Sequence, residues 1–334
     1  MRLKELGEFG LIEKIKQIVE SKSKDLIVGI EDDAAAFQLS ENQVLLLTTD
    51  ALIEGIHFNL DYFNFYQLGW RAMAVNLSDI AAMGGHADLA LITLGLPPDL
   101  EVKAVEDFYR GIKTWTNKLP IEVAGGDTTG SPGPVFINVA LVGHVETSRL
   151  VRRSGAKVGD LLYVTGTLGD AIAGMKVLQT MNEKSQKPFK GIIQRHLTPE
   201  PRIYEAQWLV ENIKVHAMID ISDGLASEVH HICRLSHVGA QIWRSYIPLS
   251  RAVQQVAKIL NEDPIDYALY GGEDFELLFV IPPSEEQKLK KFFYQKFQKN
   301  CYKVGTILSA EEGITFQEKE GKRVSLPFRG YKHF

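Results

Sequence analysis

The sequence of 334 residues contains only two cysteines, Cys233 and Cys301, and no apolar stretch that approaches the length of a membrane span. So few cysteines exclude a disulfide framework and a cysteine-based zinc site, and they fit a reducing compartment. The first residues include Arg2, Lys4 and two glutamates, which interrupt the apolar core that a signal peptide needs. We therefore expect a cytoplasmic protein that is neither exported nor embedded in a membrane.

The sequence also lacks a basic excess and several common catalytic motifs. Its formal net charge is -5 and its pI is about 6.0, which argues against a nucleic-acid partner. Neither G-x-x-x-x-G-K-[ST] nor H-R-D occurs, so P-loop and protein-kinase sites are excluded, and no G-x-S-x-G elbow supports covalent acyl transfer. Any phosphate that binds here is therefore expected to arrive with a metal ion.

The composition and the length predict a folded protein of two domains, since 45% of the residues are apolar and 24% are charged. Helix and strand patterns alternate over residues 1–148 and include two strand pairs, which predicts an α+β sheet domain with helices on one face. A polar, glycine-containing and basic segment, 152–160, marks the junction. Over residues 149–334 strand, acidic turn and helix recur, which predicts an α/β domain.

Both ends of the chain carry apolar patterns. Apolar residues recur at helical spacing between Glu8 and Glu20 and predict an amphipathic opening helix that packs on the first domain. The tail 326–334 is dense in aromatic residues, whereas ordinary disordered termini are not. We expect the tail to dock, either as a plug for the core, which its residue types favour slightly, or as the aromatic wall of a ligand pocket.

The chain is organised around the stretch Ala-Gly-Gly-Asp-Thr-Thr-Gly at 124–130, which follows a short apolar run. Its glycines allow close approach of the backbone, and Asp127 and the two threonines offer the hard oxygen ligands that Mg²⁺ takes. We expect a turn here, and a turn without any ligand is the alternative interpretation.

Similar acidic segments recur beside predicted strand and helix ends, at 31–33, 48–50, 76–79, 220–224 and 271–274. Their repetition favours more than one Mg²⁺ ion and phosphoryl chemistry, because metal ions must offset the repulsion between two phosphate groups. Asp79 lies near the C-terminal end of a helix predicted over 66–83, where an acid without a partner is unfavourable. A bound metal would remove that conflict.

Two further features have a functional and a structural interpretation. The arginines at 152–153 could hold a nucleotide phosphate, and a solvated linker is the alternative. His57 lies in a predicted loop, 51–61, where a lone histidine is more often a surface residue.

Ordered motifs along nearly the whole chain match a known family. They are GEFGLI at 7–12, DDAA at 32–35, TD at 49–50 with HF at 57–58, AVNLSDIAAMG at 74–84, GGDTT at 125–129, RSGA at 153–156, IDISDGL at 219–225, GGEDFEL at 271–277 and GYKHF at 330–334. Through these motifs the chain resembles the thiamine-monophosphate kinase family, of the superfamily that also contains aminoimidazole ribonucleotide synthetase.

The resemblance implies ATP-dependent phosphorylation of thiamine monophosphate to thiamine diphosphate by direct in-line transfer, assisted by several Mg²⁺ ions. It also implies a homodimer in which the N-terminal sheets pair into a barrel, with ATP near the dimer interface. Glu31 departs from the family, which usually has glycine before the paired aspartates, and it adds bulk and charge at a metal turn.

The same resemblance implies roles for particular residues. The metal ligands would be Asp33, Thr48, Thr49, Asp50, Asp79, Asp127, Asp220 and Asp223, of which Asp50, Asp127 and Asp220 would be catalytic. The residues that contact ATP would be Tyr109, Gly126, Asp127, Arg153 and Ser222. The residues that contact thiamine monophosphate would be His57, Glu273 and Phe328.

Two other interpretations stay open. A selenophosphate synthetase or an amidine-forming purine enzyme of the same superfamily would keep the aspartates but change the acceptor. The lack of a reactive N-terminal cysteine and the particular tail count against it. The second is a regulator that binds Mg-nucleotide without turnover, which the retention of every acidic segment disfavours.

Overall fold

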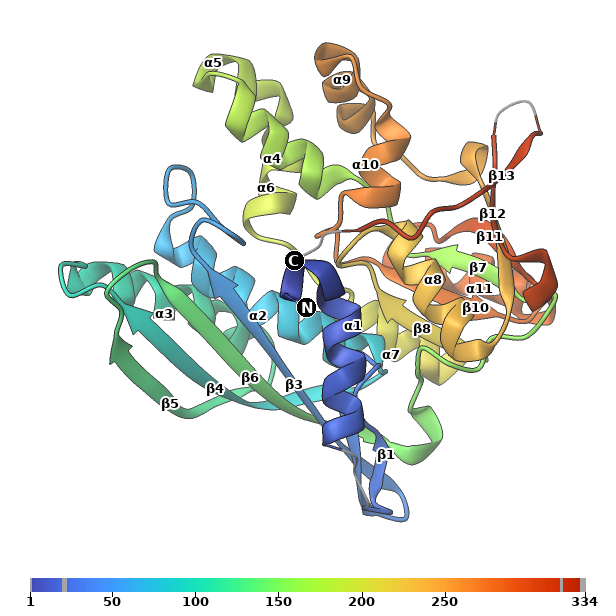
Figure 1. The fold of residues 1–334 in the computed structure, drawn as a ribbon, viewed down its shortest axis with the longest axis horizontal. Coiled ribbons are helices and arrows are strands. Elements are labelled where there is room, and N and C mark those ends of the chain that lie inside the picture. The colour runs from blue at the N-terminus through green and yellow to red at the C-terminus, as the bar shows by residue number, and fades with distance from the viewer. Residues whose placement is uncertain (1, 20–22, 319–320, 331–334) are drawn as a thin grey trace.

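The computed structural model describes residues 2–19, 23–318 and 321–330, and it contains two sheets with their helices (Figure 1). The first sheet has six strands in the order β1-β2-β3-β6-β4-β5, and the second has seven in the order β13-β12-β9-β11-β7-β10-β8. The first sheet ends at Glu146 and the second begins at Leu161, so the polar segment predicted as the junction connects them. The exact position of the domain boundary, between residues 148 and 149, stays a prediction.

The first sheet is covered by helices on one face, as the alternating pattern predicts. Its strands are β1 (Leu26–Val28), β2 (Ala35–Ser40), β3 (Gln43–Ile53), β4 (His86–Leu96), β5 (Glu122–Gly130) and β6 (Phe136–Glu146). Only β4 and β5 pair in parallel. Helix α2 (Phe65–Ala82) packs on β3, β4 and β6, and α3 (Val102–Lys118) packs on α2.

The other face of this sheet leaves apolar side chains accessible. Along β6 the residues Ile137, Val139 and Leu141 are buried, while their neighbours on the opposite side are partly exposed. On neighbouring strands Leu89 and Leu91 are 40% and 44% exposed. An apolar sheet face of this kind is unusual on a protein that works alone.

Helix α2 lies at the centre of the molecule and is buried along almost its whole length. The Asn64 side chain caps it by accepting a hydrogen bond from the Gln67 N–H at 2.9 Å. Gly69 allows α3 to approach closely, because a Cβ there would lie 1.9 Å from the Phe108 carbonyl oxygen. The helix also contacts α7 (Ile203–Asn212) and β8 (Ala217–Asp220) of the second half. It therefore joins the two halves.

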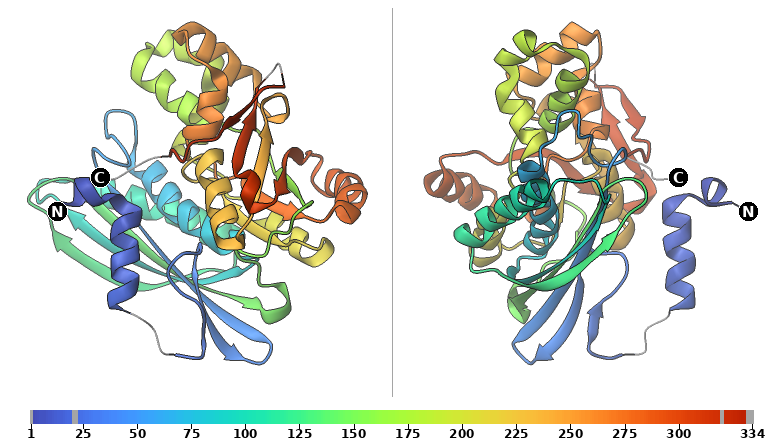
Figure 2. Two further views of the ribbon diagram at one scale, coloured as in Figure 1. Left: turned by 45° about the vertical axis from the view of Figure 1, so that its right-hand side comes forward. Right: turned by 90° about the vertical axis from the view of Figure 1, so that its left-hand side faces the viewer.

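The second sheet is mixed, with β9 and β12 as its parallel pair and antiparallel pairs elsewhere. Its other strands are β7 (Leu161–Val164), β9 (Gly239–Trp243), β10 (Leu277–Ile281), β11 (Tyr302–Leu308), β12 (Ile314–Gln317) and β13 (Arg323–Ser325). Its other helices are α4 (Asp170–Thr180), α5 (Glu183–Gln186), α6 (Lys190–Leu197), α8 (Leu225–Ser236), α9 (Arg251–Leu260), α10 (Pro264–Tyr270) and α11 (Glu286–Phe297). Figure 2 shows α4 to α6 and α9 to α10 grouped at one end of the molecule.

The structure corrects the local prediction for 124–130. This stretch is not a turn but the body of strand β5, which runs parallel to β4 from Glu122 to Gly130. The two glycines are still required, since a Cβ at Gly126 would lie 1.8 Å from the Ile92 carbonyl oxygen. Gly125 and Gly126 have φ values of 150° and 154°, a conformation that glycine adopts readily and residues with a Cβ rarely do.

One other boundary differs from the prediction. Thr49 and Asp50, expected beside a strand end, lie inside β3, which continues to Ile53 because hydrogen bonding to β6 extends the strand beyond its apolar run. Further along the chain, the polar segment 182–190 contains the short helix α5 capped by Asn182, and α7 starts at Ile203.

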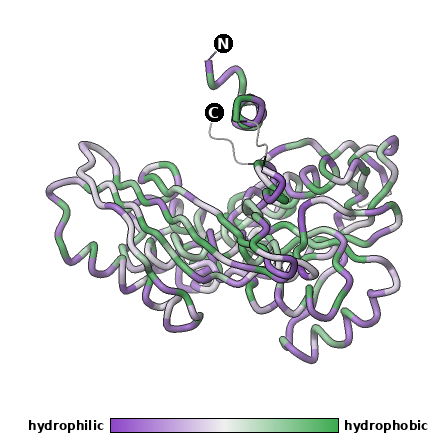
Figure 3. Tube along the Cα trace, turned by 90° about the horizontal axis from the view of Figure 1, so that it is seen from below, coloured by the Kyte–Doolittle hydropathy of each residue, from purple (hydrophilic) through white to green (hydrophobic). Residues whose placement is uncertain are grey.

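Helix α1 (Leu3–Ile18) does not pack on the first domain as predicted. None of its described side chains is buried, Ile18 is 81% exposed, and Gly7 interrupts it with a φ of 72°. Its aromatic contacts reach the second half instead, where the Phe9 ring centroid lies 5.2 Å from those of His231 and Phe328. Figure 3 shows the helix standing away from the body of the molecule.

Among the described residues, no helix combines the length and the apolar character that crossing a membrane requires.

Candidate active site

Three carboxylates from distant parts of the sequence converge at the centre of the molecule. Asp33 follows β1, Asp79 lies in the last turn of α2, and Asp220 ends β8. One carboxylate oxygen from each lies within 4.8 Å of the others. We call these three residues the carboxylate cluster.

Neighbouring hydroxyl groups hold the cluster in place. Thr48 Oγ1 donates to Asp79 Oδ2 at 2.5 Å, and Ser78 Oγ donates to Asp220 Oδ2 at 2.6 Å. Asp50, next along β3, shares a hydrogen bond with Asp79. Thr49 points to the other side of β3, where it bonds Asn138.

Burial and mutual repulsion raise the pKa of these carboxyl groups. Burial, followed by the charge of Asp33, raises the pKa of Asp220 to about 8. Burial, and then the charges of Asp50 and Asp220, raises the pKa of Asp79 well above its ordinary value. The pKa of Asp33 and that of Asp50 are also raised, chiefly by burial. Such a group of acids favours a bound cation.

The donor set of the cluster fits Mg²⁺. Every candidate ligand atom is a carboxylate or hydroxyl oxygen, which is the chemistry that Mg²⁺ prefers. Asp33 Oδ2 is buried and has no hydrogen-bond partner among the described residues. A buried acceptor without a partner is costly, and a metal ion here would satisfy it.

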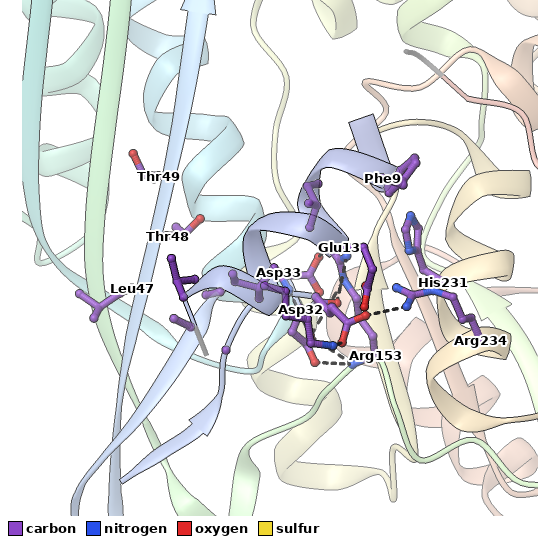
Figure 4. A pocket seen from close by; sticks show the side chains of 18 of the residues that line it. Phe9, Glu13, Asp32, Asp33, Leu47, Thr48, Thr49, Arg153, His231 and Arg234 are labelled. Atoms are coloured by element: carbon purple, nitrogen blue, oxygen red, sulfur yellow. Dashed lines mark hydrogen bonds and ion pairs between the residues drawn. The ribbon is translucent and has the colours of Figure 1, made fainter. Parts of the chain in front are cut away.

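A large cavity of about 1510 Å³ opens beside Asp33, between α1, the first strands and α8 (Figure 4). Arg153 lines it, and its Nη2 donates to Asp33 Oδ1 at 2.6 Å. Phe328 lines the same cavity, and its ring contacts Phe9, His230 and His231.

The sequence left two alternatives for the aromatic tail, a plug for the core or an aromatic wall of a ligand pocket. The described part of the tail contains both. Leu326 is 2% exposed and belongs to the core of the second half, so it acts as the plug. Phe328 is 39% exposed and forms an aromatic wall of the cavity. Residues 331–334 lie outside the described part of the chain.

Glu31 lies beside the cluster without joining it. Its φ of 120° falls in the region that favours glycine, which accounts for the glycine usual at this position. Its carboxylate pairs with Lys16 and with Arg234 Nη1, the latter at 2.7 Å. Burial alone would raise the pKa of Glu31, but these two cations lower it. The extra charge is therefore neutralised locally and does not enlarge the cluster.

A second polar group lies around Glu273, in the loop 271–275. Its carboxylate forms an ion pair with Arg71 of α2, and its Oε2 lies 3.3 Å from His196 Nδ1. Burial would raise the pKa of Glu273, but Arg71, His196 and His57 together lower it to about 2. His57 Nδ1 accepts from the Ile53 N–H at 3.0 Å. His57 lies close enough to Glu273 for its charge to lower the pKa of that carboxylate.

Ser222 and Asp223 lie in the turn between β8 and α8. The Ser222 carbonyl accepts from the Glu273 N–H at 2.7 Å, so this turn bridges the cluster and the Glu273 loop. The Asp223 N–H donates to Glu228 Oε1 at 2.8 Å, and a Cβ at Gly330 would lie 3.2 Å from Asp223. The tail therefore runs over this turn.

Asp127 is not part of the cluster in the single chain. In the sheet Asp127 pairs with Thr93, Thr93 with Asn138, and Asn138 with Ala51. Three strand spacings, or about 14 Å, therefore separate it from the strand that carries Asp50. Asp127 and Gly126 are exposed on β5, and Tyr109, 38% exposed, is on α3.

Four residues near these groups were not singled out from the sequence as site residues. Asp32 accepts from the Arg153 N–H, and burial and the charge of Asp33 raise its pKa to about 7. Glu228 is buried beside Asp223. Arg71 and His196 contact Glu273. The sequence could have indicated a role for Arg71, because this charged residue interrupts the apolar run of α2 on its buried face.

Comparisons with known proteins agree with this architecture. Residues 31–145 match the model for the AIR synthase related protein, N-terminal domain, and residues 157–316 match that for the C-terminal domain. The chain is 41% identical over 335 residues to the thiamine-monophosphate kinase of Aquifex aeolicus (strain VF5), covering 100% of both chains. It is 38% identical over 331 residues to that of Escherichia coli (strain K12), covering 98% of each.

A solved structure of AaThiL complexed with AMPPCP and TMP superposes with a TM-score of 0.87 at 40% identity, covering 100% of this chain and 99% of that one. The two domains and the buried carboxylates define an enzyme of the AIR synthase-related class. Within that class, the chain belongs to the thiamine-monophosphate kinase family. The predicted fold class and the predicted family are thus confirmed.

Proposed function

We propose that this enzyme transfers the γ-phosphoryl group of ATP to the phosphate of thiamine monophosphate and so forms thiamine diphosphate. The observation that carries the proposal is the carboxylate cluster, which lies beside Arg153 and a cavity of about 1510 Å³. Family membership supports the choice of acceptor, since full-length relatives are named for thiamine monophosphate. The related structure that holds AMPPCP and TMP supports both substrates.

The chemistry we propose is direct and in line. A terminal oxygen of the thiamine monophosphate phosphate attacks the γ-phosphorus of ATP, the bond from the γ-phosphorus to the β–γ bridging oxygen breaks, and ADP leaves. Both reactants are anions, so their approach must be offset by positive charge. Bound Mg²⁺ would supply that charge.

The residues of this chain would divide that work. We propose that Asp33, Asp50, Asp79, Asp220 and Asp223, with Thr48, hold more than one Mg²⁺ ion. The Thr49 hydroxyl faces the other side of β3, so Thr49 would reach an ion only through its backbone carbonyl. Arg153, with its guanidinium fixed by Asp33, would hold a nucleotide phosphate, and Ser222 would contact ATP from its turn. His57 and Glu273 would contact thiamine monophosphate, with Phe328 as an aromatic wall.

We also propose a homodimer that forms through the exposed face of the first sheet. The accessible apolar residues of that face, among them Leu89 and Leu91, support this arrangement. Asp127 gives a second reason, because it lies about 14 Å from the strand of Asp50 within one chain. In the dimer, Gly126 and Asp127, and also Tyr109, would reach the ATP bound by a second copy.

The direct test is incubation of the purified protein with ATP, Mg²⁺ and either thiamine monophosphate or thiamine, followed by separation of the thiamine species. Thiamine diphosphate should form from thiamine monophosphate, and thiamine should remain unchanged, since it offers the site no phosphate to bind. Comparable turnover of both acceptors would overturn the proposed acceptor.

A titration of Mg²⁺ at fixed ATP tests the number of ions. The rate should continue to rise after all the ATP is complexed, because one ion per ATP cannot fill a site that uses several. Saturation at one Mg²⁺ per ATP would contradict the proposed multi-ion site.

A further inference from the structure

One buried arginine, Arg71, joins α2 to the loop that carries Glu273. Its side chain is 1% exposed and forms an ion pair with Glu273 Oε1, while its Nη1 donates to the His196 carbonyl at 2.7 Å. On the other side, His196 Nδ1 lies 3.3 Å from Glu273 Oε2. Both oxygens of the Glu273 carboxylate therefore have a fixed neighbour.

The loop that Arg71 anchors has an unfavourable backbone. Gly272, Glu273 and Phe275 have φ values of 69°, 60° and 49°. Residues other than glycine adopt this left-handed conformation only at an energetic cost. The Glu273 N–H bonds the Ser222 carbonyl at 2.7 Å, the Asp274 carboxylate accepts from the N–H groups of Gly169 and Ala171, and the Glu273 carboxylate is held by its ion pair with Arg71. A strained loop held by several anchors is typical of a functional site.

Helix α2 holds the carboxylate cluster as well as Glu273. Ser78 follows Arg71 by seven residues, so the two lie on one face of the helix, about 10 Å apart along its axis. Ser78 Oγ donates to Asp220 Oδ2 at 2.6 Å. The separation between Glu273 and Asp220 is therefore set by one rigid, buried helix.

We infer that Arg71 is a positioning residue for the acceptor: it fixes the Glu273 carboxylate at a set distance from the carboxylate cluster. The acceptor of the proposed function carries a phosphate at one end and a cationic ring at the other, so its two ends would meet the cluster and Glu273 respectively. The inference rests on the proposed function, in which the phosphate lies at the cluster. Glu273, whose pKa is about 2, stays ionised and attracts the positive ring.

The test uses Arg71→Met, Arg71→Lys and a matched control, Arg244→Met. In Arg71→Met the KM for thiamine monophosphate should rise about tenfold, while the KM for ATP stays within about twofold. Arg71→Lys should recover part of the loss, because lysine keeps the charge but cannot bond Glu273 and His196 together. Arg244 pairs with Asp263 and Glu318 in the second half, so its substitution should leave both KM values unchanged.

A double variant keeps the test decisive if Arg71→Met folds poorly. Adding Glu273→Gln removes the buried charge that Arg71→Met leaves without its partner, which should restore folding. Its KM for thiamine monophosphate should equal that of Glu273→Gln alone, because the two residues act as one unit. Additive increases in KM, or an unchanged KM in folded Arg71→Met, would overturn the inference.

A substrate-free measurement separates this inference from the proposed function. Hydrogen exchange at the Glu273 amide should become faster in Arg71→Met, while the amides of α2 keep their protection. Equal exchange in both proteins would overturn the positioning role. A wild-type protein that does not turn over thiamine monophosphate would instead overturn the proposed function, and with it the assignment of Arg71 to this acceptor.

Discussion

The carboxylate cluster and strand β5 both contain aspartates, but those of the cluster are buried or partly buried and that of β5 is exposed. Asp33 and Asp220 are buried, held by neighbouring donors, and brought together from the two halves of the chain. Asp127 is exposed on an edge strand, and its side chain accepts a local hydrogen bond from the Thr128 N–H at 2.9 Å. One chain is thus sufficient to assemble the first group, whereas the second needs a partner or a ligand to acquire neighbours.

The largest effect is expected at the cluster. Asp220→Asn removes a buried negative charge where a cation would bind, so the rate should fall by about a thousandfold. The melting temperature in EDTA should be nearly equal below about pH 8 and higher above it, where Asp220 of the wild type is ionised and repelled by Asp33. Rates at saturating Mg²⁺ and melting curves in EDTA measure both effects. A near-normal rate would exclude Asp220 from metal binding.

A smaller loss, about a hundredfold, is expected for Asp127→Asn, with an unchanged melting temperature because the residue is exposed. If Asp127 acts on the site of a second copy, mixing and reassembling this variant with Asp220→Asn should restore about a quarter of the wild-type rate. In such mixed dimers one site contains both native aspartates. No recovery would mean that Asp127 acts within its own chain or has no role.

The pH dependence of stability tests the raised pKa of the cluster in metal-free protein. Since the pKa of Asp220 is about 8 in the folded state and about 3.8 when unfolded, the folded state holds the extra proton between these values. Stability therefore falls as pH rises from about 4 to about 8. Asp220→Asn should weaken this fall, and Asp127→Asn, the exposed control, should not. Equal pH slopes in wild type and Asp220→Asn would contradict the assignment.

The smallest effect on activity is expected for Asp274→Asn, next to Glu273. Asp274 accepts hydrogen bonds from the N–H groups of Gly169 and Ala171 at the start of α4, at 2.6 and 3.1 Å. Asparagine can still accept a hydrogen bond there, so the rate should stay within about twofold of wild type. Steady-state kinetics beside Glu273→Gln provide the comparison, and a loss as large as that of Glu273→Gln would give Asp274 a role in the site.

The sequence predicted secondary structure correctly where the apolar residues repeat at a single period. The helix predicted over 66–83 forms as α2, because its apolar residues repeat at helical spacing. The same reasoning failed for β5, since Gly-Gly-Asp-Thr-Thr has the composition of a turn. Pairing with β4 decided otherwise, as tertiary context often does for glycine-rich segments.

Several site residues had no local signal. His196 and Glu228 each lie among other polar residues in an amphipathic helix, and their roles depend on which loop lies opposite. The contact of Phe9 with Phe328 joins the two ends of the chain, so neither end predicts it alone. A contact between distant segments is set by the packing of whole elements, which sequence periodicity does not encode.

The sequence by itself predicted the class of chemistry and the family, of which the comparisons confirm the family. Its acidic segments, absent P-loop and ordered motifs indicated metal-assisted phosphoryl transfer and the family, because ligand type and motif order are properties of the chain. Only the tertiary structure decided which acids share a site. Asp33, Asp79 and Asp220 converge because α2 is buried between the two sheets, while Asp127 stays on a strand three spacings away. The distances between these aspartates follow from how the helices and strands pack. The spacing of the residues along the chain does not indicate these distances.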